Sequence, residues 1–405
     1  CINAGHPDSI DSDGSISDMG VFSYLNSYSG PDWYVETTGN DTTGTGSSGS
    51  PFASIQSAIN FATTDGDSVA VAAGTYVENI IFRGWNIAVI GMDSSNTAID
   101  GNNTDRVVSF ENGEGPATVL RNFTIKNGYI ANSSGGGIRC KSYSSPTLMN
   151  LIIKNNIAGD DGGGLMCQHS SNPVLKNVII SNNTANSSGG GIYAGNASFT
   201  LDGVMVSNNT ATGDDGGVME AGGISVNTEN DSSNKHIRIV NSIISGNTAS
   251  GGSSTGGLVI INIDSVTIAS TEINGNSGMY TGGLYTNQVN YFNMSSSLVS
   301  ENSGLHYGGV SFLATANENP AHITNCTITN NSYTDLGSEG NAAELMVERV
   351  AFINVLNSII ASEQTPAVTV GNHNFIESAE LTIGYSLISD GQDSIDIYDD
   401  GTLIW

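Results

Sequence analysis

Residues 150–192 read NLIIKNNIAGDDGGGLMCQHSSNPVLKNVIISNNTANSSGGGI, and this stretch contains two copies of one sequence pattern. In each copy an aliphatic residue leads into an Asn pair, and a glycine pair with another aliphatic residue follows. The repeat recurs in steps of 26 to 38 residues, with its aliphatic anchors at Ile125, Ile153, Ile180, Val206, Ile244, Ile273, Val299, Ile328, Ile360 and Ile388. A period of this size indicates a solenoid.

The repeating unit consists of short strands. Val178 and Ile180 alternate with other residues, as do Ile192 and Ala194, which is the two-residue period of a strand with one buried face. A single unit buries its inward residues only by stacking on its neighbours, which pairs each strand in parallel with its copies. The prediction is an all-β fold, a parallel β-helix of about a dozen coils.

The corners of each coil carry Asn and Gly. The Asn pairs recur in register at 155–156, 182–183, 208–209 and 330–331. Asn tolerates left-handed backbone, and its amide can bond to the copy one coil away. The glycine pairs are expected to supply positive φ where the wall bends.

Composition limits the class of partner. The chain has 405 residues and 51 glycines. Its net charge of −28 would repel the phosphates of nucleic acid, so nucleic acid is a poor partner. No apolar run reaches the roughly 18 residues of a membrane span. The twelve N-x-S/T sequons, which include Asn293, leave glycosylation open because an Asn-rich ladder also creates such matches by chance.

Cys140 and Cys167 fall one coil apart at the same register. Stacking would place their Cα atoms about 4.8 Å apart, which is within disulfide range. The column continues through mostly apolar residues, so a bridge and two buried thiols are both open.

Residues 1–32 lie outside the repeat and end in a linker. They hold an acidic loop with Asp11, Asp13 and Asp18 around Gly14. Spaced Asp residues with a Gly turn can coordinate calcium, although the full EF-hand pattern is missing. A calcium site and an acidic surface turn are the two interpretations.

Residues 33–110 read as an N-terminal cap with the first coils. Ser54 is a good helix N-cap, and the apolar residues Ile55, Ala58, Ile59 and Ala62 follow at helical spacing. A helix laid across the first coil would shield the open core from water. The regular coils then occupy 111–405.

The run from Tyr34 through Pro51–Gln56, Gly66-Asp67 and Gly74–Tyr76 resembles the N-terminal cap of secreted right-handed β-helix proteins, the pectate-lyase-like superfamily. The repeats are similar to those of chlamydial polymorphic outer-membrane proteins, which are adhesin passenger domains. The resemblance covers roughly residues 33–390. It implies a right-handed, secreted, cell-surface solenoid, but fold does not fix activity.

Cys1–Gly5 with Asp18–Gly20 resembles the closing segment at the C-terminal end of such domains, here placed first. The other end finishes in an apolar strand without such a segment. Open strand edges invite another chain. We therefore expect head-to-tail assembly with copies of itself, or a place in a tandem array, through Cys1, Ile2, Leu403, Ile404 and Trp405.

The sequence shows few groups of residues with the types and spacing of a catalytic site. The chain has five Lys and six Arg, and those in the repeats accompany no in-register trio of carboxylates. Asp160-Asp161 and Asp214-Asp215 occupy equivalent corners two coils apart, where they could hold an ion, flank a sugar or simply be solvated. Tyr280 and His306-Tyr307 precede successive glycine pairs and predict either an aromatic step for a sugar or turn packing.

The sequence thus predicts a non-catalytic extracellular structural or adhesive β-helix. The alternative is a polysaccharide lyase or glycan-binding module. Turnover or binding of acidic polysaccharides in the presence of calcium would separate the two.

Overall fold

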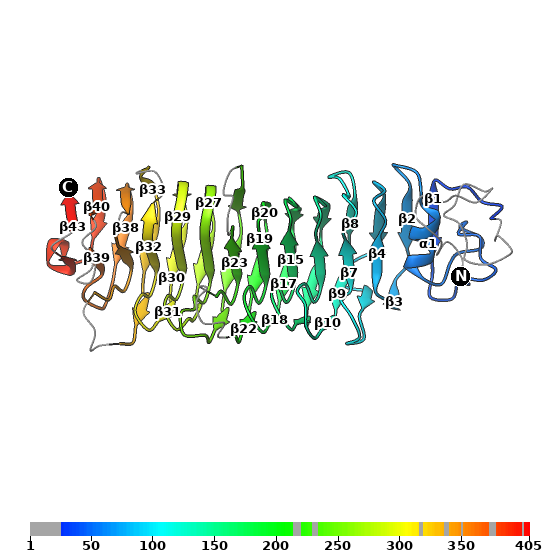
Figure 1. Ribbon diagram of the computed structural model, residues 1–405, viewed down its shortest axis with the longest axis horizontal. Coiled ribbons are helices and arrows are strands. Elements are labelled where there is room, and N and C mark those ends of the chain that lie inside the picture. The colour runs from blue at the N-terminus through cyan, green and yellow to red at the C-terminus, as the bar shows by residue number, and fades with distance from the viewer. Residues whose placement is uncertain are drawn as a thin grey trace.

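The computed structural model describes residues 26–213, 220–228, 234–315, 319–335, 340–349, 351–371, 378–398 and 401–405. They form a row of stacked coils, with the single described α-helix near one end and the C-terminus at the other (Figure 1). Every strand pairing between named strands of the described chain is parallel, so the predicted parallel β-helix is confirmed.

One sheet has twelve strands, with one strand from each coil. This number agrees with the expected dozen coils. These strands are β3 (Gly74–Val77), β6 (Thr97–Asp100), β9 (Thr124–Lys126), β13 (Ile152–Lys154), β17 (Ile179–Ser181), β21 (Met205–Ser207), β25 (Ile243–Ser245), β28 (Glu272–Asn274), β30 (Leu298–Ser300), β34 (Thr327–Thr329), β38 (Ile359–Ala361) and β41 (Leu387–Ile388).

A larger sheet of 24 strands forms the other walls in two runs. The first run contains β4 (Ile80–Phe82), β7 (Val108–Phe110), β11 (Ile138–Cys140), β15 (Leu165–Gln168), β19 (Ile192–Gly195), β23 (Ile224–Asn227), β32 (Val310–Thr315), β36 (Leu345–Val347), β39 (Val368–Val370) and β42 (Ile395–Ile397). The second run contains β1 (Asp32–Val35), β2 (Ser68–Val71), β5 (Ala88–Gly91), β8 (Val119–Arg121), β12 (Thr147–Met149), β16 (Val174–Lys176), β20 (Phe199–Asp202), β24 (His236–Val240), β33 (Ala321–Thr324), β37 (Phe352–Leu356), β40 (Ala379–Gly384) and β43 (Gly401–Ile404).

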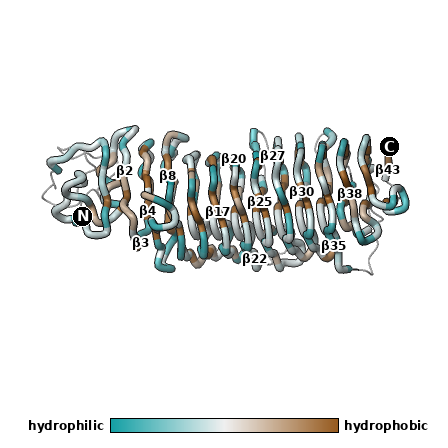
Figure 2. The backbone as a smooth tube through the Cα atoms, turned by 180° about the vertical axis from the view of Figure 1, so that it is seen from behind, coloured by the Kyte–Doolittle hydropathy of each residue, from teal (hydrophilic) through white to brown (hydrophobic). Residues whose placement is uncertain are grey.

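Two long strands, β27 (Leu258–Ala269) and β29 (Leu284–Ser295), belong to both runs. Short strands line one corner: β10 (Tyr129–Ile130), β14 (Ile157–Ala158), β18 (Thr184–Ala185), β22 (Thr210–Ala211), β26 (Thr248–Ala249), β31 (Ser303–Gly304) and β35 (Ser332–Tyr333). Apolar stretches recur at matching places from coil to coil (Figure 2). Each inward column is therefore a continuous part of one core.

The predicted capping helix is α1 (Ile55–Phe61), and the Ser54 side chain accepts a hydrogen bond from the backbone N–H of Ser57. Its buried residues pack over the first coil, where the rings of Phe52 and Phe61 stack with centroids 5.1 Å apart. The helix seals the open core as expected.

The two residues of each Asn pair have different tasks. The first, such as Asn182, is exposed with a positive φ of 55°, and the second, Asn183, is fully buried. The Asn183 amide donates to Oδ1 of Asn209 at 3.0 Å, and the contact repeats along the corner. This ladder comprises Asn156, Asn183, Asn209, Asn247, Asn276, Asn302 and Asn331.

The glycine pairs serve close approach instead of positive φ, so that part of the prediction was wrong. Positive φ belongs to the preceding residue, as at Gly162 with 68°. A Cβ on Gly163 would lie 2.5 Å from the carbonyl oxygen of Gly190, and one on Gly164 would lie 2.7 Å from that of Gly191. A methyl group there would push the stacked coils apart.

Cys140 and Cys167 are direct partners on β11 and β15, as their register predicted. Both are buried free thiols, so the thiol alternative describes this structure. Burial raises the pKa of the Cys140 thiol well above its usual value. Within the described ranges no helix has the length and apolarity needed to cross a membrane.

Candidate functional site: an arginine groove on the outer face

A groove of about 550 Å³ lies on the outer face of β4, β7 and β11. Ile81, Ser109 and Arg139 are direct partners on these strands and form its floor. Their neighbours Phe82, Phe110 and Cys140 face the core, as strand alternation requires. The floor is therefore a single outward column crossing three coils.

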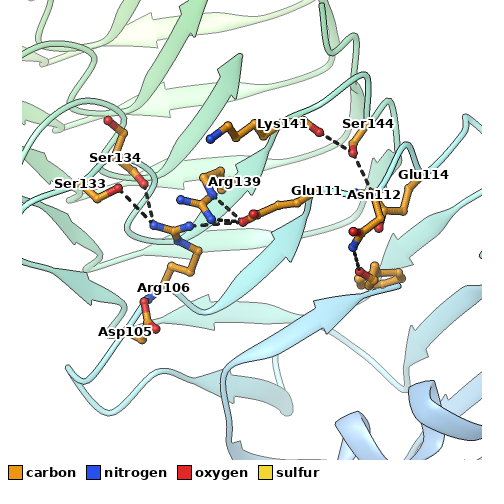
Figure 3. A network of polar contacts seen from close by, with 11 residues as sticks. Asp105, Arg106, Glu111, Asn112, Glu114, Ser133, Ser134, Arg139, Lys141 and Ser144 are labelled. Atoms are coloured by element: carbon orange, nitrogen blue, oxygen red, sulfur yellow. Dashed lines mark hydrogen bonds and ion pairs between the residues drawn. The ribbon is translucent and has the colours of Figure 1, made fainter. Parts of the chain in front are cut away.

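One carboxylate joins two arginines inside this arginine groove (Figure 3). Oε1 of Glu111 accepts from Nη1 of Arg106 at 3.3 Å and from Nε of Arg139 at 2.6 Å, and Nη2 of Arg139 also donates to it. Nη2 of Arg106 donates to Oγ of Ser133 and to the carbonyl of Ser134. These contacts fix the planes of both guanidiniums, which line the groove.

The two arginines differ in access. The Arg106 side chain is only 8% exposed, whereas that of Arg139 is 19% exposed. Burial lowers the pKa of Arg106 and the carboxylate of Glu111 opposes that shift. Arg106 stays charged, because a guanidinium is not deprotonated in proteins.

A second polar network holds the loop that carries Glu111. The fully buried carboxylate of Glu114 accepts from Oγ of Ser144 at 2.7 Å and from the backbone N–H groups of Asn112 and Gly84 at 3.0 Å. The Asn112 amide donates to the carbonyl of Phe82. These bonds tie the loop after β7 to the neighbouring coils and so fix the position of Glu111.

Positive charge gathers in this part of an acidic chain. Eight of the eleven Lys and Arg residues lie between Arg83 and Lys176, a stretch with only seven Asp and Glu residues. Lys141 extends alongside Arg139 (Figure 3). Within the groove lining the charges of Arg106 and Arg139 balance those of Asp105 and Glu111, and Lys141 adds a positive charge next to Arg139 outside that lining.

The groove suits recognition of an anionic group better than acid–base chemistry. Its floor presents the half-exposed Ile81 beside Arg139, and Asn79, Asn112 and Ser133 supply hydrogen-bonding groups. Oε1 of Glu111 is occupied by both guanidiniums, so this carboxylate orients the two arginines. The arrangement can bind a carboxylate beside polar and apolar surface.

The residues predicted to bind a sugar do come together. The ring centroids of Tyr280 and His306 are 5.3 Å apart, and those of Tyr280 and Tyr307 are 5.1 Å apart. Tyr307 is buried, however, and its hydroxyl donates to Glu348 at 2.7 Å. This packing fits the turn alternative, and sugar binding at Tyr280 and His306 stays a prediction.

The remaining predicted sites are only partly described. Asp11, Asp13 and Asp18 lie outside the described residues, as do Cys1, Ile2, Asp214 and Asp215, so the calcium and assembly hypotheses stay predictions. Leu403 packs against the core, while Ile404 and Trp405 are 44% and 52% exposed. Oδ2 of Asp160 accepts from Oγ of Ser134 at 3.2 Å.

Sequence reasoning missed Arg106 and Glu111 because it looked for carboxylate trios in register. The available signal was the crowding of Lys and Arg between Arg83 and Lys176. It points to the correct coils, but it does not show which side chains meet.

A comparison with protein-family models agrees with the observed fold. Residues 57–234 match the family model described as a right handed beta helix region. The matched stretch is less than half of the 405 residues, and over it the family model agrees with the parallel β-helix of the structure. No curated protein sequence matches the chain.

Similar solved structures include pectate lyase Pel9A, with 15% identity, a TM-score of 0.43 and coverage of 88% of this chain and 78% of that one. The Agl-KA catalytic domain has 14% identity, a TM-score of 0.45 and coverage of 86% and 64%. A mannuronic acid specific polysaccharide family 6 lyase from human gut microbiota has 12% identity, a TM-score of 0.42 and coverage of 83% and 86%. At these identities the likeness concerns the fold alone. The resemblance to chlamydial repeats finds no support among these matches.

Proposed function

We propose that this chain is a non-catalytic extracellular β-helix that attaches to carboxylate-bearing polysaccharides through the arginine groove. The observation that carries the proposal is the pair of fixed guanidiniums, Arg106 and Arg139, around Glu111 in an open groove. A uronate carboxylate would approach Arg139, the more accessible of the two. Arg106 would hold the geometry from the buried side.

The charge distribution supports this choice of ligand. A chain with a net charge of −28 repels polyanions over most of its surface, so an acidic polysaccharide would be confined to the one segment where cations gather. Attraction across water is screened by salt, which makes such binding dependent on ionic strength.

Replacing Arg139 with glutamine is expected to weaken binding of oligogalacturonate by about tenfold or more, since a charge-assisted bidentate contact is lost. Isothermal titration calorimetry at low and high salt would measure this. Arg238→Gln, at an exposed position on β24, is the matched control and should keep the wild-type affinity. Equal losses in both variants would mean diffuse attraction and would contradict the proposal.

The same samples separate binding from catalysis. A lyase acting on a uronate polymer would generate unsaturated sugar ends that absorb in the ultraviolet. We expect no such absorbance with polygalacturonate, with or without added calcium. Steady turnover by the wild type that is lost in Arg139→Gln would replace the adhesive function by the lyase alternative.

A further inference from the structure

A second groove, of about 460 Å³, lies on the outer face of β27, β29 and β33, several coils away from the arginine groove. Thr267, Asn293 and His322 are direct partners on these three strands and line it in one row. Parallel strands are about 4.8 Å apart, so this row spans about 9.6 Å. The interior neighbours Val266 and Phe292 are buried, which holds the row facing outward.

An exposed aromatic ring stands beside this polar row. Tyr291 is 61% exposed and, with Pro320, gives the groove an apolar side. A single exposed tyrosine is ordinary on a protein surface. Here the ring adjoins three hydrogen-bonding side chains on one face of a sheet, which is the combination that a sugar with one apolar face and several hydroxyls requires.

The polar row has unused hydrogen-bonding capacity. Within the described ranges, the side chains of Thr267, Asn293 and His322 make no hydrogen bond or ion pair with the rest of the chain. Neighbouring outward residues do pair, as Nδ1 of His236 does with Oγ of Ser265 at 2.6 Å. A ligand would therefore meet donors and acceptors without first breaking internal bonds.

The lining also lacks formal charge. None of the residues that line this groove is Asp, Glu, Lys or Arg, in a chain with 39 acidic residues. An anionic sugar would find no cation here to offset its desolvation. The chemistry thus differs from that of the arginine groove and fits an uncharged sugar.

We propose that this second groove, named the Tyr291 groove, binds a neutral polysaccharide, with a sugar ring stacked on Tyr291 and its hydroxyls bonded to Thr267, Asn293 and His322. The site is independent of the arginine groove. With both sites occupied, one molecule would join an acidic and a neutral polysaccharide.

Affinity electrophoresis of the full chain tests this proposal, with β-glucan, xylan, galactomannan or polygalacturonate embedded in the gel. The protein is produced in a host that does not glycosylate, because Asn293 heads a sequon. At least one neutral polymer should retard the wild type. Tyr291→Ala should weaken that retardation by about tenfold, whereas Tyr291→Phe should keep it because stacking needs only the ring.

Tyr385→Ala is the matched control, since Tyr385 is 94% exposed and lies outside this groove. Arg139→Gln should lose retardation by polygalacturonate alone, so failures of the two proposed sites are distinguishable. Two results would overturn the Tyr291 groove as a binding site. One is a wild type that no neutral polymer retards, and the other is equal behaviour of Tyr291→Ala and Tyr385→Ala.

Discussion

Replacing Asn247 with alanine is expected to lower the free energy of unfolding by about 3–5 kcal/mol. The Asn247 amide donates to the carbonyl of Val206 at 2.9 Å and to Oδ1 of Asn276 at 2.9 Å. Its own oxygen accepts from the backbone N–H and the side-chain amide of Asn209, both at 3.0 Å. Alanine would remove all four bonds from a site that water does not reach.

The loss is large because the partners stay buried. The carbonyl of Val206 and the N–H of Asn209 would each lose a partner in the core, and an unsatisfied buried group costs about 1–3 kcal/mol. Urea denaturation followed by circular dichroism would measure the change. Asn172→Ala, at an exposed position, is the matched control with little expected effect. A loss below about 1 kcal/mol for Asn247→Ala would show that the ladder contributes little to stability.

Replacing Glu344 with glutamine is expected to stabilise the protein by about 3 kcal/mol at pH 8 and to have little effect below pH 5. Glu344 is fully buried beside the last Asn of the ladder. Its Oε2 accepts from the side-chain amide of Asn331 at 2.5 Å, and its Oε1 accepts from the backbone N–H of Asn331 at 3.3 Å. Glu344 thus takes the place of the next asparagine.

The pH dependence follows from burial, which raises the pKa of Glu344 to about 7. Below pH 4.5 the carboxyl group is protonated in both the folded and the unfolded chain, so its contribution to stability is complete. Between pH 4.5 and 7 the unfolded chain releases the proton while the folded chain keeps it, and stability falls as the pH rises. Above pH 7 the loss is constant.

Glutamine would remove this loss and keep the contacts. The preceding coil shows that one amide oxygen can accept two such bonds. There Oδ1 of Asn331 accepts from the backbone N–H of Asn302 at 3.0 Å and from its side-chain amide at 2.8 Å. Denaturation midpoints from pH 4 to pH 8 would test the prediction. Glu363→Gln, at an exposed position in the next coil, should leave the pH profile unchanged. An unchanged profile in Glu344→Gln as well would contradict the assigned cause.

Much of the fold could be predicted because a solenoid uses local and repeated rules. The anchor at Ile153 and its copies fixed the register of the strands, and Ser54 marked the start of the capping helix. The recurring Asn pairs predicted hydrogen bonds between asparagines of successive coils. The tasks of the two residues in each pair could not be separated, since both are the same amino acid and only the turn of the backbone sends one side chain inward.

The glycine pairs were located correctly from the sequence, but the need for glycine there was attributed to positive φ and not to the close approach of neighbouring coils. Glycine at Gly163 is compatible with a need for positive φ or with a need for space, and the sequence does not distinguish the two. The distance to the carbonyl of Gly190 in the next coil decides for space.

The sequence by itself determined the period, the strand faces, the capping helix and the acidic character of the chain, because each depends on residues close together in the chain or on their sum. The tertiary structure alone decided that Arg106 and Arg139 share Glu111, that Tyr291 and His322 line one groove, and that Glu344 ends the Asn ladder. Those contacts join separate coils, and the turns that aim each side chain vary in length from coil to coil. Their meeting points depend on the packing of whole coils, which no short-range pattern encodes.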